Sequence, residues 1–235
     1  MFSFVVPVYD RTQQLRESIR SLFRQTDQDF EILLVCDGSP DATLEVVEEL
    51  AEHPRVRVLQ YRSNSGNACR GRNRGIDMAR GRFICLHDSD DIAHHERLAR
   101  TRKAIETHDA DGVYGQTRIL MDGTRRVDGI TNGQVLDPPE FSFETLKRIN
   151  LMMTCSVAVR RDLLLRFGGF RAAMRYREDH ELWLRLAYHG CRWVRAEGVL
   201  CHYRLHGGNA ELVLGQDSDH WFDQALYWYD KPFLQ

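Results

Sequence analysis

Three carboxylates lie within four residues, at Asp88, Asp90 and Asp91, directly after the apolar run Phe83–Leu86. Such a run predicts a buried strand, and buried charge is costly without a partner. Crowded carboxylates repel one another, so we expect a cation among them. Oxygen ligands suit Mg²⁺ or Mn²⁺, which would keep open positions for phosphate oxygens. The alternative is a polar turn that opens a helix, with Ser89 or Asp91 as its N-cap.

A segment rich in arginine and glycine, residues 66–75, precedes this strand. It matches neither the G-x-G-x-x-G fingerprint nor a P-loop, which argues against a dinucleotide or NTPase site. Arginine at the start of a helix opposes the helix dipole, but it is favourable where an anion binds. Opposite an acidic metal site, this segment would form a basic wall for a diphosphate. The alternative is an ordinary solvated basic face.

Acidic residues also open a predicted helix, Glu178–His189. Acids in a first turn suit the helix dipole, which is the structural alternative to a functional role. Asp179, however, shares its face with apolar residues at i+3, i+4 and i+7. Because that face packs inward, Asp179 is a candidate general base. Its neighbour Glu178 is predicted to lie nearer the polar edge of the helix.

Two histidines four residues apart, His202 and His206, share one face of a predicted strand with Arg204. Most single histidines are structural. An arginine on the same face and the following Gly207-Gly208 would also suit an approach to a phosphate or a metal ion. Both interpretations stay open on these residues alone.

The elements that must position these residues alternate regularly between strand and helix through residue 110. The predicted strands are Phe2–Tyr9, Phe30–Cys36, Val56–Tyr61 and Phe83–Leu86. Continuous apolar strands predict an α/β fold, with a mostly parallel sheet covered by helices on both faces. Ligands bind beyond the carboxyl ends of such strands. Asp10, Asp37 and the carboxylates from Asp88 onward follow three of the strands, so acidic groups converge at one edge.

The second half is less regular. We expect helices at 92–108, 143–149 and 162–167, strands at 112–121, 155–159 and 193–204, and a mobile loop at 128–141. No linker-like stretch separates the halves, which predicts one domain with two lobes. The aromatic segment Trp221–Tyr229 is expected to pack back onto this domain, with a dimer contact or a membrane-surface contact as alternatives.

Composition bounds the remaining classes. The chain has 235 residues, 43% of them hydrophobic and 28% charged, with a formal net charge of −2. This charge gives no case for nucleic acid as a partner. The longest apolar run, Phe2–Val8, is too short to span a bilayer, and a start within a strand indicates no signal peptide. The six cysteines include no C-x-x-C pair, so we expect reduced core thiols of a cytoplasmic protein, neither zinc ligands nor disulfides.

Taken in order, these motifs resemble the family 2 glycosyltransferases with the GT-A fold, over about residues 2–209. The segments that carry the resemblance are Val6-Pro7-Val8-Tyr9-Asp10, Asp37-Gly38-Ser39, Arg72-Asn73-Arg74-Gly75-Ile76, Asp88-Ser89-Asp90-Asp91, Gly168-Gly169-Phe170, Glu178-Asp179 and Tyr203-Arg204-Leu205-His206. The resemblance implies a single Rossmann-like domain over 1–235. Within it, about 1–110 would bind the nucleotide sugar, about 111–209 would bind the acceptor and perform catalysis, and 210–235 would be an aromatic tail.

The resemblance also implies a metal-dependent, inverting transfer of a sugar from a nucleoside diphosphate donor, most often UDP-linked. The acceptor would be a hydroxyl of a saccharide or lipid-linked molecule, in cell-surface polysaccharide or glycoconjugate synthesis at the inner face of the membrane. Asp179 would be the base, with Glu178 beside it. The ligands of Mn²⁺ or Mg²⁺ would be Asp88, Asp90, Asp91 and His206. The donor contacts would be Pro7, Tyr9, Asp10, Asp37, Arg72, Asn73, Asp88, Ser89, Arg204 and His206.

Two other classes remain as alternatives. A glycoside hydrolase also uses paired carboxylates, but it needs neither a metal ion nor a basic diphosphate wall. A catalytically degenerate protein that binds a nucleotide sugar would keep the site and lose turnover. Nucleotide binding excludes the first alternative, and turnover of the donor excludes the second.

Overall fold

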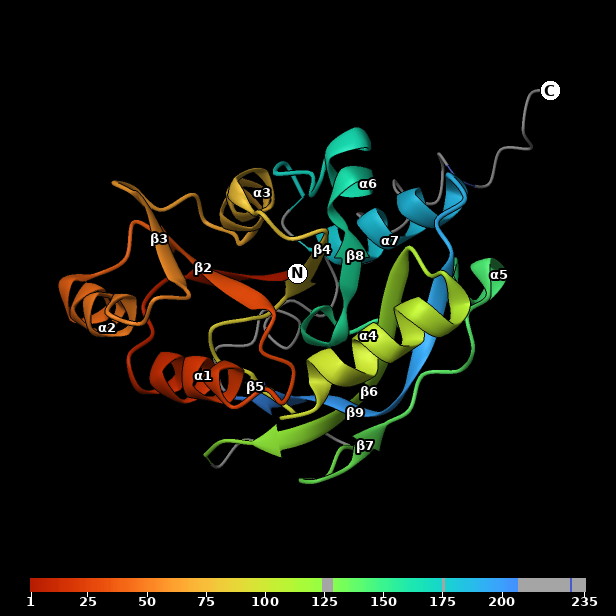
Figure 1. The fold of residues 1–235 in the computed structure, drawn as a ribbon, viewed down its shortest axis with the longest axis horizontal. Coiled ribbons are helices and arrows are strands. Elements are labelled where there is room, and N and C mark those ends of the chain that lie inside the picture. The colour runs from red at the N-terminus through yellow and green to blue at the C-terminus, as the bar shows by residue number, and fades with distance from the viewer. Residues whose placement is uncertain (124–128, 175, 207–228, 230–235) are drawn as a thin grey trace.

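The computed structural model, described for residues 1–123, 129–174, 176–206 and 229, has a central sheet between two layers of helices (Figure 1). The strands are β1 (Phe2–Val8), β2 (Phe30–Asp37), β3 (Val56–Tyr61), β4 (Phe83–Leu86), β5 (Ile92–Ala93), β6 (Gly112–Met121), β7 (Val135–Leu136), β8 (Ala158–Arg160) and β9 (Trp193–Leu205). The helices are α1 (Gln13–Phe23), α2 (Asp41–Ala51), α3 (Cys69–Met78), α4 (Arg97–His108), α5 (Phe143–Leu146), α6 (Arg161–Arg166), α7 (Glu178–Tyr188) and the 3-10 helix η1 (Thr154–Ser156).

The first half confirms the predicted parallel sheet. The strand order is β3-β2-β1-β4-β8-β6-β9-β5, with β7 beside β6. β1 is parallel to both β2 and β4, and β2 is parallel to β3. Every residue of β2 is buried, which explains its continuous apolar sequence because both faces of the strand are covered.

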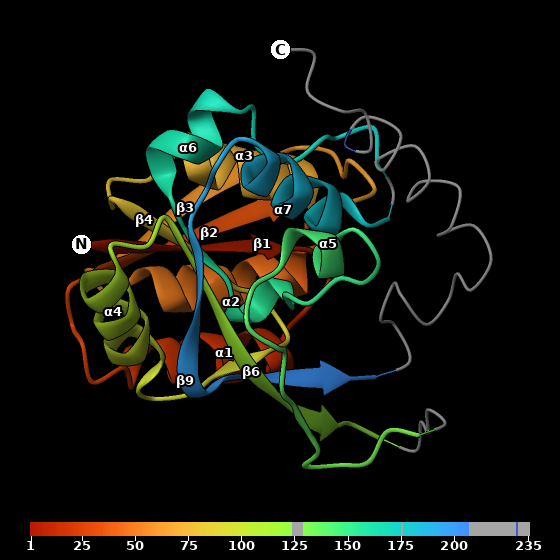
Figure 2. The same cartoon turned by 90° about the vertical axis from the view of Figure 1, so that its right-hand side faces the viewer.

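Helices cover both faces of this sheet, as predicted (Figure 2). On one face, apolar side chains of α1, α2 and α4 pack against β1, β2 and β4. On the other face, α3, α6 and α7 bury a second apolar cluster that contains Trp183 and Trp193. The two clusters make the sheet the rigid centre from which the loops at its edge project.

The second half adds antiparallel pairs to the sheet. β8 runs antiparallel to β4 and β6, whereas β6 and β9 are parallel to each other. The short strand β5 pairs antiparallel with β9, with Ile92 opposite His202. This pairing brings the turn that precedes β5 next to the end of β9. Asp88–Asp91 and Arg204–His206, far apart in the sequence, thereby become neighbours.

Several predicted elements of the second half are wrong in extent. The helix expected from residue 92 begins only at Arg97, because Ile92–Ala93 pairs with β9 instead. No helix directly follows Asp91, so the N-cap alternative for Ser89 and Asp91 is also wrong. The strand expected at 155–159 is divided between η1 and β8. The helix expected at 143–149 ends at Leu146, and the loop expected at 128–141 contains β7.

The six cysteines are free and buried, as expected of core thiols. Of the aromatic tail, only Tyr229 lies within the described residues. Its ring lies 5.4 Å from that of Tyr188, and its hydroxyl donates to Glu181 Oε1 at 2.9 Å. At this residue the chain packs back onto its own domain. In the described ranges, every helix is too short or too polar to cross a membrane.

Candidate active site

The acidic residues meet at one edge of the sheet, as predicted. Because β1, β2 and β4 are adjacent and parallel, their carboxyl ends lie side by side. Asp10 follows β1 in the left-handed region, with φ 37°. Asp37 ends β2, and the turn that carries Asp88 follows β4. This edge is where a ligand binds in open α/β sheets.

Asp37 is buried and held on both carboxylate oxygens. Its Oδ2 accepts hydrogen bonds from the Ser65 backbone N–H at 2.9 Å and from the Ser65 hydroxyl at 2.7 Å. Its Oδ1 accepts from Arg70 Nε at 2.7 Å. The Arg70 guanidinium lies over the Tyr61 ring, 4.1 Å from the centroid. This network fixes the carboxylate at the end of β2, and neither Ser65 nor Arg70 was among the predicted site residues.

The other residues predicted from the first strand differ in exposure. Tyr9 is 49% exposed, so its ring is free to stack on a planar ligand. Pro7 lies against α3. If Gly71 of this helix had a Cβ atom, that atom would lie 3.1 Å from the Cβ of Pro7. Asn73 faces away from this edge. Its amide donates to the Phe170 carbonyl and accepts from the Phe170 N–H, at 2.7 and 2.8 Å.

Arg72 joins two parts of the site. The side chain is buried, and its Nη2 donates to Asp88 Oδ1 while its Nη1 donates to Glu178 Oε1, both at 2.8 Å. The guanidinium also lies 5.2 Å from the centroid of the Phe170 ring. The turn after β4 and the start of α7 are therefore both bound to the guanidinium group of Arg72. Asp88 and Arg72 come together as the sequence suggested. Arg72 was expected to contact the diphosphate of the donor, but in the structure its terminal nitrogens bind the carboxylates of Asp88 and Glu178.

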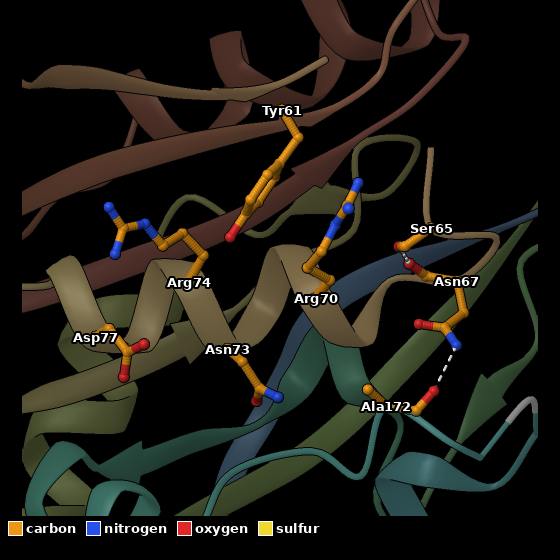
Figure 3. Close-up of a pocket in the computed structure, with 8 residues that line it drawn as sticks. All are labelled: Tyr61, Ser65, Asn67, Arg70, Asn73, Arg74, Asp77 and Ala172. Atoms are coloured by element: carbon orange, nitrogen blue, oxygen red, sulfur yellow. Dashed lines mark hydrogen bonds between the residues drawn. The ribbon is translucent and has the colours of Figure 1, made fainter. Parts of the chain in front are cut away.

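The arginines of α3 thus divide between two faces of the helix. Arg72 points into the protein, whereas Arg70 and Arg74 line an outer pocket of about 420 Å³ (Figure 3). The complete lining is Tyr61, Ser65, Asn67, Arg70, Asn73, Arg74, Asp77 and Ala172. Asn67 closes one end by donating to the Ala172 carbonyl at 3.1 Å. The basic wall predicted from sequence is therefore not one continuous surface.

Asp90, in the turn between β4 and β5, pairs with His206, which follows β9. Its Oδ2 lies 2.9 Å from His206 Nε2 and 3.5 Å from Arg11 Nε. Burial disfavours the charged form, but the hydrogen bond from His206 and the charge of Arg11 outweigh it and lower the pKa of Asp90. Asp90 and His206 are thus brought together as predicted.

Arg204 braces the same turn. Its Nε donates to the Asp90 carbonyl at 2.7 Å, and its two terminal nitrogens pair with Asp122 and Glu17. The Arg204 N–H donates to Asp91 Oδ1 at 2.8 Å. Arg204 therefore fixes the backbone of the acidic turn.

Asp91 and Ser89 lie deeper than Asp90. Ser89 is 9% exposed and Asp91 only 1%. Burial raises the pKa of Asp91 well above its usual range, and the neighbouring carboxylates add to this effect. In the described part of the chain, Asp91 forms a compact group of potential ligands with Cys155 and Cys201, apart from the Asp90–His206 pair.

His87 supports the acidic turn, Asp88–Asp91, from its buried side. Arg97 Nη1 donates to His87 Nδ1 at 3.1 Å, so Nε2 carries the proton and donates to Ser18 Oγ at 3.0 Å. Ser18 in turn donates to the Asp88 carbonyl at 3.2 Å. Burial and the charge of Arg97 lower the pKa of His87 well below its usual value, which keeps the ring neutral. The chain of bonds ends on the backbone of Asp88.

Asp179 lies at the start of α7, half-buried and held by three donors. Its Oδ2 accepts from Asn150 Nδ2 at 3.1 Å and from Thr154 Oγ1 at 3.0 Å, and its Oδ1 accepts from the His180 N–H at 2.7 Å. The apolar neighbours on its face are buried, as predicted. Asn150 and Thr154 escaped the sequence analysis because single polar residues in loops carry no periodic signal.

Glu178 is not at the polar edge, contrary to the prediction. Its side chain is 19% exposed and pairs with the buried Arg72. Burial raises the pKa of Glu178, Arg72 opposes this, and Asp179 adds to it. Helical spacing gave the wrong orientation because Arg177, the N-cap residue just before α7, has φ 56° and turns the chain sharply where the helix begins.

The family comparison decides the class. A model of "Glycosyl transferase family 2" matches residues 3–168, which is well over half of the chain. The chain belongs to glycosyl transferase family 2. Neither the hydrolase nor the binding-protein alternative gains support from any comparison.

The curated relatives of this chain carry glycosyltransferase names. The amylovoran biosynthesis glycosyltransferase AmsB of Erwinia amylovora is 30% identical over 99% of this chain and 78% of its own length. Glycosyltransferase GlyG of Streptococcus pneumoniae is 37% identical over 49% of this chain and 38% of its own. The match to the poly(ribitol-phosphate) β-N-acetylglucosaminyltransferase TarS of Staphylococcus aureus covers only 20% of that protein. The chain thus spans less than two thirds of several relatives.

Solved structures show the same GT-A fold. The structure of S. aureus TarS 1–349 in complex with UDP has a TM-score of 0.74 at 21% identity, covering 98% of this chain and 67% of that one. The mannosyltransferase PcManGT from Pyrobaculum calidifontis, in complex with GDP-Man and Mn²⁺, has a TM-score of 0.68 at 19% identity, covering 90% and 59%. The predicted fold class is confirmed.

Proposed function

We propose that this glycosyltransferase moves a sugar from a UDP-linked donor to a hydroxyl group of a saccharide or lipid-linked acceptor, with a divalent cation and with inversion at the anomeric carbon. The observation that carries the proposal is the Arg72 bridge between Asp88 and Glu178. It ties the donor edge of the sheet to the helix that carries Asp179. Structural neighbours in complex with UDP and with UDP-GlcNAc support the choice of nucleotide.

The residues present suit a hard divalent cation. Asp88, Asp90 and His206 offer two carboxylates and an imidazole, a set that Mn²⁺ or Mg²⁺ accepts together with water and phosphate oxygens. Asp90 Oδ2 and His206 Nε2 lie 2.9 Å apart, close to the spacing of neighbouring ligands around an ion with bonds of about 2.1 Å. We leave Asp91 out of this set because its carboxylate is buried beside Arg204 and two cysteines. The cation would neutralise charge that develops on the diphosphate.

On the donor side, we assign Tyr9 and Asp37 to the binding of the nucleotide base. Tyr9 offers an exposed ring, and Asp37 is a carboxylate fixed by Ser65 and Arg70.

We assign Arg72 a positioning role, because both of its terminal nitrogens are engaged by Asp88 and Glu178. Arg204 likewise positions the turn of Asp90, whereas Asn73 secures the loop at Phe170.

On the acceptor side, Asp179 is the base. It takes the proton from the acceptor hydroxyl as that oxygen attacks the anomeric carbon and the bond to the diphosphate breaks. Asn150 and Thr154 hold its Oδ2 in one orientation, so no rotamer search precedes proton transfer. Glu178 is less suited to this role because Arg72 occupies its carboxylate. A base on the side opposite the leaving group gives inversion.

Calorimetric titration of UDP with and without Mn²⁺ tests the donor half of the proposal. We expect binding to depend on Mn²⁺ in the unaltered protein and to lose that dependence in Asp90→Ala, since a ligand of the cation is gone. Asp162→Ala is the matched control, because Asp162 is an exposed partner of Arg160 outside the site. Equal UDP affinity with and without Mn²⁺ in the unaltered protein would contradict the proposal.

A further inference from the structure

Behind the acidic turn lies a second group of ligand-type side chains that the proposed reaction does not use. The carboxylate of Asp91 and the thiols of Cys155 and Cys201 place one atom each within 4.8 Å of one another. In the described ranges of the chain, this is the one set of three such residues so close together. All three are buried, at 1%, 1% and 0% exposure.

One oxygen of this group has no hydrogen-bond partner. Asp91 Oδ1 accepts from the Arg204 N–H, but Oδ2 is buried with no donor among the described residues. A buried carboxylate oxygen left without a partner is costly. A cation bound between Oδ2 and the two sulfur atoms would remove that cost.

The charges around Asp91, Cys155 and Cys201 also favour a cation bound between these three side chains. Arg97 is completely buried, and the acceptors of its hydrogen bonds are neutral: the Leu86 and Val157 carbonyls and His87 Nδ1. Its positive charge acts on Cys155, against the burial that raises the pKa of that thiol. One carboxylate, two thiolates, one divalent cation and Arg97 sum to zero charge. Without the ion, the hydrogen bonds of the buried Arg97 within the described residues all go to neutral acceptors.

The ligand types select the metal. Thiolates are soft ligands, which Zn²⁺ accepts readily and Mg²⁺ and Mn²⁺ do not. We propose that Asp91, Cys155 and Cys201 bind one zinc ion, with a water molecule as the fourth ligand. On binding, each thiol gives up its proton to solvent and its sulfur donates an electron pair to the ion. The site could not be predicted from a short sequence motif, because the three ligands come from distant segments.

The position of the site suggests its role. Asp91 adjoins Asp90 of the proposed catalytic metal site, and Cys155 adjoins Thr154, which orients Asp179. Cys201 lies on β9, the strand that leads to His206. A zinc ion would therefore link the three segments that carry Asp90, Thr154 and His206, and it would lie on their buried side. It acts as a structural ion, separate from the cation of the reaction.

The metal content of the purified protein tests the inference without any measurement of activity. We expect about one zinc per chain by elemental analysis, after preparation without chelators. Protein produced in zinc-poor medium with Co²⁺ should show a near-ultraviolet thiolate-to-cobalt charge-transfer band. A cation at Asp88, Asp90 and His206 has no sulfur ligand and gives no such band, so the two sites are distinguishable.

Two serine variants and a matched control complete the test. Cys155→Ser and Cys201→Ser should each lose the zinc and the cobalt band, whereas Cys191→Ser, which alters a buried cysteine elsewhere, should keep both. If the first two variants fail to fold, the zinc content and cobalt spectrum of the unaltered protein still decide. Unaltered protein that folds without zinc and shows no thiolate–cobalt band would overturn the proposal. So would a band that persists when Cys155→Ser and Cys201→Ser are combined in one protein, or a disulfide between Cys155 and Cys201 in the purified protein.

Discussion

At the scale of single residues, Arg72 determines how the two halves of the site are held together. One buried guanidinium serves two carboxylates, Asp88 and Glu178, that belong to different elements. Removing it leaves two negative charges facing each other in a partly dry setting. The penalty for breaking a buried ion pair on one side usually exceeds what the pair contributes to stability.

We expect Arg72→Met to lower the free energy of unfolding by about 3 kcal/mol, the lower end for a broken buried pair, because both carboxylates keep some contact with solvent. Adding Glu178→Gln should recover part of this loss, since it removes one of the unpaired charges. Urea denaturation of Arg72→Met, of Glu178→Gln alone, of the double variant and of Arg74→Met measures the effect. Arg74 is exposed on the same helix, so its replacement should stay within about 0.5 kcal/mol. Strictly additive losses would show that Arg72 and Glu178 do not interact.

At the scale of elements, the turn between β4 and β5 carries the carboxylates of the proposed cation site, and several elements support it. Arg204 contacts it from β9, Arg72 from α3, and the chain Arg97–His87–Ser18 from behind. Such supporting residues fix the orientation of metal ligands without touching the metal.

His87→Ala should therefore weaken Mn²⁺ binding by about 10- to 100-fold while leaving the ligands themselves in place. The physical reason is that Ser18 loses its donor and the Asp88 carbonyl loses its fixed position. Titration of Mn²⁺ followed by electron paramagnetic resonance gives the affinity. His108→Ala, at the exposed end of α4, should bind Mn²⁺ as the unaltered protein does. An unchanged affinity in His87→Ala would mean that the turn is held without this chain.

The sequence predicted elements best where each is determined by its own residues. The continuous strands β1, β2 and β4 and the apolar face of α7 follow from local sequence pattern, whereas the burial of β3 alternates along the strand. The strand β5 could not be predicted, because Ile92 and Ala93 adopt it only through pairing with β9. In the site, carboxylates at strand ends were found, whereas Asn150, Thr154 and Ser65 were missed. Their roles depend on tertiary contacts that no spacing records.

At the scale of the whole molecule, the parallel first half carries the proposed donor edge, and the mixed second half carries the proposed base. Thr154 of η1 holds Asp179 of α7. Arg72 of α3 joins Glu178 of α7 to Asp88 after β4, and His206 at the end of β9 pairs with Asp90 in the same turn. The division into a nucleotide-binding half and an acceptor half stays a prediction. If it holds, catalysis requires both sets of elements, whereas donor binding requires mainly the first.

This division is tested most directly by Asp179→Asn, which keeps the shape of the side chain and removes its basicity. Sugar transfer to an acceptor and UDP affinity should be measured on the same preparation, beside Glu178→Gln. We predict that Asp179→Asn slows transfer by about 10²- to 10⁴-fold, the usual cost of losing a general base, while UDP affinity stays within a few-fold. Glu178→Gln should slow transfer less. Near-normal transfer by Asp179→Asn, with an inactive Glu178→Gln, would contradict the account and reverse the assignment.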